Sequence, residues 1–140
     1  MKQSLSLFII LLLLLSLCSC NSGQSLDSAL AELEALANER GGKISVYRPS
    51  DGGSVPDPII SLYGKAGTPP DELALLDYAV IWYSDRLSPS DAAIFRLKNA
   101  TDSPSLIKMC KRRANTLFLT LGVTATVSED GHYVRFYNLG

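Results

Sequence analysis

Few side chains in this chain of 140 residues are of the types that usually catalyse reactions. His132 is the one histidine, and Ser128 and Glu129 are its nearest candidate partners in the sequence. A catalytic triad needs a base held between a nucleophile and a carboxylate. All three residues fall in one predicted hairpin, so we expect His132 to be an exposed turn residue. The fourteen acids leave open a carboxylate pair of the kind found in glycosidases, without indicating which two.

Metal, phosphate and nucleic-acid chemistry have little support. A structural zinc site needs four cysteine or histidine ligands, and no glycine-rich segment stands between a strand and a helix as a phosphate loop requires. The net charge of −1 is far from the basic balance of a nucleic-acid-binding protein. The sequence therefore predicts no catalytic residue, no metal ligand, no cofactor and no nucleic-acid partner.

The most specific chemistry lies at Cys18 and Cys20, just after a run of thirteen mostly apolar residues at 5–17. A helix that crosses a membrane needs about 20 residues, so this run is too short to span. With Lys2 before it, the run fits an export signal. The order Leu17-Cys18-Ser19-Cys20 resembles the lipobox of bacterial lipoproteins, in which a small residue precedes the cysteine that receives lipid.

This resemblance implies that the Cys20 thiol carries a diacylglyceryl group and that a peptidase cuts just before it. Cys18 does not fit, because Leu17 would occupy the small position. An ordinary secretory signal with two incidental cysteines is the alternative. We thus expect a signal peptide at 1–19, a tether at 20–24 and one domain at 25–140. The protein would be anchored to the cell membrane on its extracytoplasmic side, with Cys110 as the only free thiol of the mature protein.

The rest of the sequence predicts a small α+β domain, with an antiparallel sheet of about four to five strands. Helical spacing of leucine and alanine predicts a helix at 25–40. Lys43–Tyr47 is a strand, and Ile59–Tyr63 is a helical turn or a short strand. Two hairpins are expected at 76–98 and 123–138, and a second helix at 104–119 begins near a proline.

Apolar patterns predict how two of these elements face the core. In the second helix the apolar stripe consists of Leu106, Ile107, Cys110, Ala114, Leu117 and Phe118, which places the Cys110 side chain in the core. In the last hairpin, a turn at Asp130-Gly131 would place Val127 opposite Val134.

Charge is unevenly distributed along the chain. Residues 20–91 hold eleven acids and five bases, whereas residues 92–140 hold three acids and seven bases. We expect the two halves to attract each other within one fold. A basic docking face in the second half is the alternative.

The second half also resembles a known family. Ile94-Phe95-Arg96-Leu97-Lys98, then a helix that carries Arg113, then Gly131-His132-Tyr133 in a closing strand, resemble the bacterial lipoprotein family called domain of unknown function 4358. The resemblance covers about half of the chain. It implies a lipid-anchored location and this order of elements, and it brings no established activity.

Aromatic side chains give the remaining clue to function. Trp82 lies in the first hairpin, and Tyr133, Arg135 and Tyr137 share one face of the last strand. Aromatic residues beside an arginine suit a recognition surface, although half-buried sheet positions have the same composition. We therefore expect a non-enzymatic module that binds an envelope protein or a wall component. The alternatives are a small carboxylate hydrolase acting on wall or saccharide material, and an accessory subunit of an envelope complex.

Overall fold

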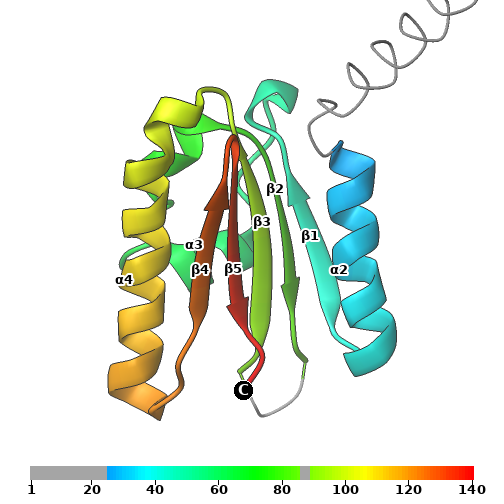
Figure 1. Cartoon of the computed structure of the whole chain (residues 1–140), viewed down its shortest axis with the longest axis vertical. Helices are drawn as coiled ribbons and strands as arrows, with labels where there is room; N and C mark the ends of the chain where they lie inside the picture. Colours follow the sequence, from blue (N-terminus) through cyan, green and yellow to red (C-terminus); the bar gives the residue numbers. More distant parts are fainter. Residues whose placement is uncertain (1–24, 86–88) are drawn as a thin grey trace, which may run out of the picture.

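A five-stranded antiparallel sheet stands between two helical layers in the computed structural model, which describes residues 25–85 and 89–140 (Figure 1). Helix α2 covers one face of the sheet, and α3 and α4 lie on the other. The predicted α+β domain is therefore confirmed. The predictions for residues 1–24, the signal peptide and the tether, lie outside the described residues.

The strands follow the spatial order β1-β2-β3-β5-β4, so the two hairpins pair through β3 and β5. Their bounds are β1 Lys43–Tyr47, β2 Leu76–Tyr83, β3 Asp91–Leu97, β4 Thr126–Asp130 and β5 Tyr133–Asn138. The helices are α2 Leu26–Arg40, α3 Asp57–Tyr63 and α4 Ser103–Leu121, with a 3-10 helix, η3, at Asp71–Leu75. Both predicted hairpins, the first strand and both long helices are present.

Strands β2 and β3 form the centre of the molecule and are buried on both faces. Ala79, Ile81, Ala93 and Phe95 point toward α3 and α4, while the alternate residues of the same strands point toward α2. This period of two explains why both strands are apolar almost throughout. Two separate apolar layers therefore hold the helices, one on each side of the sheet.

Helix α4 is rotated slightly from the predicted stripe. Leu106, Cys110 and Leu117 are buried as expected, but Phe118 is 59% exposed and Met109 is buried in its place. Consecutive residues differ by about 100° around a helix. Because the sheet contacts the side that carries Leu117, Phe118 turns toward solvent.

The last hairpin has a different register from the predicted one. Its turn is Gly131-His132, so Asp130 lies opposite Tyr133 and Val127 lies opposite Phe136 instead of Val134. Gly131 has φ +58°, which suits the first position of a tight hairpin turn. The error amounts to two residues in each pairing, so every side chain keeps the predicted face.

Candidate ligand groove between α3 and α4

The clearest concave surface of the described chain lies on the α3–α4 side of the sheet. A cavity of about 330 Å³ is bounded by the end of β2, the start of β3, one side of α3 and Arg113 of α4. Its walls are mainly apolar, with Pro58, Leu62, Tyr83 and Pro89 among them. This volume lies within the range of small-ligand sites.

A second, more polar cavity of about 800 Å³ lies next to the first. It lies between α4 and the segment that joins α3 to η3, and its lining includes Lys65, Thr68 and Glu72. Leu62 and Arg113 line both cavities. The two spaces are therefore neighbours on either side of these residues, and we call the combined surface the α3–α4 groove.

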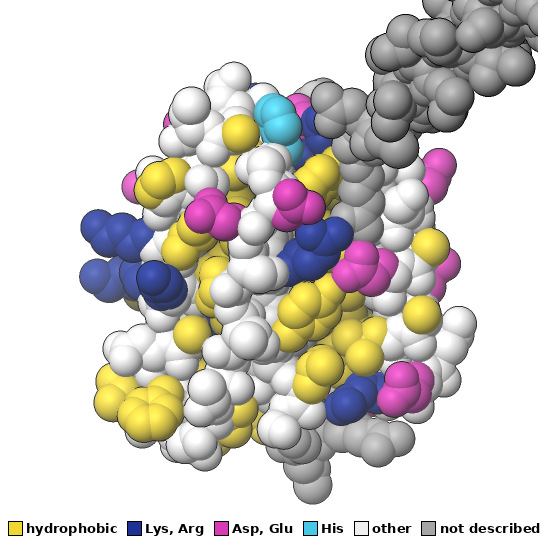
Figure 2. Space-filling view, viewed as in Figure 1, with side chains coloured by type: hydrophobic (Ala, Val, Ile, Leu, Met, Phe, Trp, Pro, Cys, Tyr) yellow, Lys and Arg dark blue, Asp and Glu magenta, His cyan; other side chains and the backbone are white. Residues whose placement is uncertain are grey.

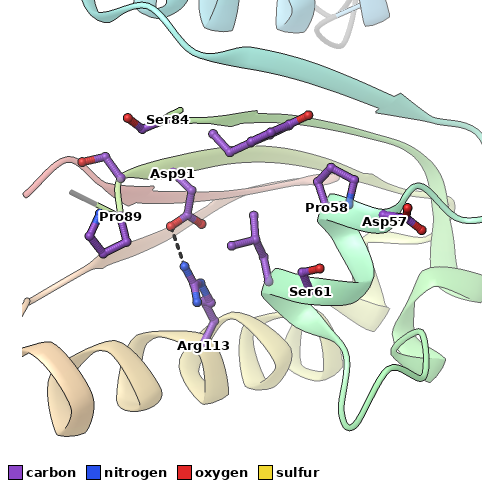
Figure 3. Close-up of a pocket in the computed structure, with 10 residues that line it drawn as sticks. Asp57, Pro58, Ser61, Ser84, Pro89, Asp91 and Arg113 are labelled. Carbon is purple, nitrogen blue, oxygen red and sulfur yellow. Dashed lines mark hydrogen bonds and ion pairs between the residues drawn. The ribbon is translucent and has the colours of Figure 1, made fainter. Parts of the chain in front are cut away.

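A buried ion pair marks the junction. Arg113 Nη2 donates to Asp91 Oδ1 at 2.8 Å, and the two side chains are 13% and 1% exposed (Figure 3). Asn138 Nδ2 also donates to Asp91 Oδ1, at 3.2 Å. In Figure 3 the arginine reaches up from α4 to the carboxylate at the start of β3, and α3 stands across the cavity from them.

Local sequence explains how the pair is placed. Asp91 is the first residue of β3, where it lies opposite both Tyr83 and Asn138. Arg113 lies on α4 four positions before Leu117, so it shares the sheet-facing side of the helix with that buried leucine. The fold thus brings an acid and a base from the two halves of the chain together beneath α3.

Several polar atoms around the pair are buried without a well-aligned hydrogen bond to any described residue. They are Asp91 Oδ2, Arg113 Nε, Asn138 Oδ1 and the Tyr63 hydroxyl. Burial, and next the negative charge of Asp91, raise the pKa of Tyr63 well above its ordinary value. Native proteins leave few buried polar groups unsatisfied, so four in one cluster set this place apart from the rest of the core.

A second pair lies in the outer cavity. Arg112 Nη1 donates to Glu72 Oε1 at 2.7 Å. This hydrogen bond is the main reason why the pKa of Glu72 is lowered. Each arginine that lines the groove is therefore already neutralised by one acid.

The predicted interaction surface is assembled only in part. Tyr133, Arg135 and Tyr137 share the sheet face that α2 covers, and the Tyr133 ring lies between the guanidinium groups of Arg96 and Arg135, 5.9 and 5.8 Å from its centre. The Tyr137 hydroxyl donates to Glu32 of α2. These contacts use many of the polar groups that a partner would otherwise bind.

Trp82 does not belong to any surface, which corrects the prediction. Its side chain is 1% exposed beneath α2, and its Nε1 donates to the Gly41 carbonyl at 2.7 Å. The aromatic content of β2 reflects burial on both faces. Whether Tyr133, Arg135 and Tyr137 contact a partner stays a prediction.

Other predicted chemistry can now be placed. His132 lies in the hairpin turn, where Nδ1 is 3.0 Å from the Leu97 carbonyl oxygen. Cys110 is fully buried, and burial raises the pKa of its thiol to about 12. Among the described residues no group of three or more histidines, cysteines and acids could hold a metal ion. No helix in the described ranges is long and apolar enough to cross a membrane.

The sequence did not predict the groove. In the sequence, Asp91 ends the segment Ser88-Pro89-Ser90-Asp91, whose composition is typical of a turn, and Arg113 is a basic residue beside the apolar stripe of the second predicted helix. One signal was present, because an arginine next to a core-facing stripe needs a buried partner. Nothing in the sequence identified that partner.

Comparison with known proteins gives no match for this chain. No family model matches the chain, and no curated protein and no solved structure matches it either. The similarity to the lipoprotein family therefore rests on the quoted motifs alone and stays a prediction.

Proposed function

We propose that the protein is a lipid-anchored binding module of the bacterial cell envelope and that it holds its ligand in the α3–α4 groove. One observation carries the proposal. Arg113 is mostly buried at the junction of two cavities and makes a single hydrogen bond to the described residues. A guanidinium has five N–H donors, so most of the donors of Arg113 are not used by the described residues.

Binding explains the groove better than hydrolysis does. A carboxyl that acts as a general acid needs a raised pKa. Glu72 has the opposite shift because of Arg112, and Asp91 is paired with Arg113. Neither Glu72 nor Asp91 is therefore suited to act as the general acid that the hydrolase alternative requires.

The position of the groove also suits an anchored module. The start of α2, next to the predicted tether, lies at one end of the domain, and the ends of β2 and β3 that border the inner cavity lie at the other (Figure 1). The 19 residues of α4 extend for about 28 Å between these ends. If Cys20 carries lipid, the inner cavity lies at the end of the domain opposite to the attachment of the tether.

Thermal unfolding tests the proposal with full-length protein in detergent. The protein is heated alone and with separated protein, glycan and lipid fractions of a bacterial envelope. We expect one fraction to raise Tm, because a ligand that binds only the folded state stabilises it. We expect Arg113→Lys to lose most of that rise, because lysine keeps the charge that Asp91 requires but not the planar fork.

Arg135→Lys is the matched control, since Arg135 lies on the opposite face of the sheet. It should respond to the active fraction as the natural protein does. An equal rise in Tm for the natural protein and Arg113→Lys would contradict the groove. Mass spectrometry of the recovered ligand checks the alternative, because a cleaved ligand would favour hydrolysis.

A further inference from the structure

The charge balance of the α3–α4 groove restricts the ligand that it can hold. Its two arginines are each paired with an acid, Arg113 with Asp91 and Arg112 with Glu72. Asp57 of the inner cavity and Lys65 and Asp71 of the outer one are the other charged residues of the lining. At the junction itself a ligand group with a full charge would meet only charges that are already paired, and burying an unpaired charge is costly. The inner site therefore favours an uncharged polar group.

The junction also requires a particular kind of polar group. Arg113 has donors that no described residue uses, and Asp91, which lines the inner cavity, has a buried acceptor, Oδ2, without a well-aligned hydrogen bond to any described residue. An amide carries one acceptor and one donor and has no charge. A hydrocarbon chain would satisfy none of these groups.

The walls on either side distinguish between amide-bearing ligands. Pro58, Leu62 and Tyr83 make the inner cavity mainly apolar, whereas the outer cavity is more polar. Sugar hydroxyls in the inner cavity would be buried with few partners, at a cost. Small aliphatic side chains would fit the inner walls, while the hydroxyls of Ser61 and Thr68 lie along the groove for further backbone groups.

We infer that the α3–α4 groove binds an extended, uncharged stretch of peptide with small apolar side chains, and that a backbone carbonyl of this peptide accepts hydrogen bonds from Arg113. The peptide passes over Arg113 and Leu62, which line both cavities, and so occupies the two neighbouring spaces. This inference rests on the proposed function and adds the class of ligand.

Nuclear magnetic resonance of the full-length protein in detergent tests the inference. The Nε–H signal of Arg113 is assigned by its loss in Arg113→Lys, and acetyl-tetraalanine amide, an uncharged capped peptide, is titrated in. We expect a saturable shift of this signal and none of the Arg135 Nε–H signal. Arg113→Lys should weaken peptide binding about tenfold, which corresponds to the loss of one hydrogen bond to a charged group.

Arg112→Lys provides the second variant. Arg112 lines only the outer cavity and is 50% exposed, so its replacement should change peptide affinity by less than about threefold. Both lysine variants keep the charge of their ion pairs, and unchanged spectra elsewhere would show that they fold. A loss in Arg112→Lys as large as that in Arg113→Lys would overturn the placement at the junction.

Two further probes decide between ligand classes. Chitotetraose carries acetamido groups on a sugar chain, and octanoate carries a charged head on an apolar chain. A saturable shift of Arg113 with either of them, and none with the peptide, overturns the peptide assignment. If an envelope fraction still stabilises the natural protein more than Arg113→Lys, the groove stands and only its ligand class is wrong. If no fraction and no probe binds, both proposals fail.

Discussion

Arg112 and Arg113 are neighbours in the sequence, yet they experience different environments. Arg112 is 50% exposed and pairs with Glu72 on the rim of the groove, whereas Arg113 is 13% exposed and pairs with the buried Asp91. Exposed pairs contribute little to stability because water screens them. Removing one partner of a buried pair is far more damaging, because the other charge stays buried. Conservative variants are therefore needed to study Arg113.

The Glu72–Arg112 pair predicts a pH dependence of stability. The pKa of Glu72 is lower in the folded protein than its ordinary value, mainly because of the hydrogen bond from Arg112. Its contribution is therefore complete above the ordinary glutamate pKa of about 4.3 and is lost as the pH falls through the lower folded-state pKa. We expect Glu72→Gln to cost about 0.2–1 kcal/mol at pH 7.

Urea unfolding at several pH values measures this difference. The gap between the natural protein and Glu72→Gln should shrink steadily below pH 4. A gap that stays constant down to pH 2 would show that the glutamine variant loses packing and not charge. Asp51→Asn changes an exposed acid outside the groove and serves as the control.

At the scale of elements, the connection from α2 to β1 holds the helix against the sheet. Gly41 ends α2 and gives its carbonyl to Trp82, and Gly42 follows with φ +91°. A Cβ on Gly42 would lie 2.5 Å from the Tyr83 carbonyl oxygen and 2.8 Å from Trp82 Nε1. The chain can pass so close to β2 only because this residue has no side chain.

Alanine substitutions in this connection should differ in severity. In Gly42→Ala the alanine would need a left-handed backbone conformation, and its Cβ would clash with β2. We therefore expect a loss of unfolding free energy well above the roughly 1–2 kcal/mol of backbone strain alone. Gly41→Ala would have the backbone strain but no clash, and Gly53→Ala would have neither strain nor clash. Thermal unfolding of the three variants checks this order, and equal losses for Gly41→Ala and Gly42→Ala would contradict the close packing.

At the scale of the whole molecule, the uneven charge of the sequence is resolved inside the fold. Four ion pairs are found among the described residues, and each joins a base of the second half to an acid of the first: Arg96–Asp77, Arg112–Glu72, Arg113–Asp91 and Arg135–Glu32. The predicted attraction between the halves is thus confirmed. Lys108 and Lys111 remain exposed with Arg112 on the outer side of α4, where Figure 2 shows a group of basic side chains.

The anchor is the prediction that concerns the complete protein. Cys20→Ser should abolish labelling by a radioactive fatty acid and leave an uncleaved precursor, because the thiol that receives lipid is gone. Cys18→Ser should still be labelled and cleaved. Labelling that persists in Cys20→Ser would show that the wrong cysteine was chosen, and labelling absent from the natural protein would support an ordinary secretory signal.

The sequence by itself determined the elements and most of their faces. Periods of 3.6 and 2 residues located α2, α4 and the two hairpins, because local side-chain spacing decides which face can be buried. The same logic placed Cys110 in the core correctly. It failed at Phe118, which is next to the sheet-facing Leu117, and in the register of the last hairpin, where a shift of two residues leaves every side chain on the same face.

Only the tertiary structure decided the site. Asp91, Arg113 and Tyr63 are far apart in the chain and have no shared pattern, so nothing local predicts that they cluster. Trp82 shows the opposite case, since its sequence context suggested a surface and the docking of α2 buried it. A ligand groove depends on how helices and sheet pack over long sequence distances, and this packing is a property of the folded chain.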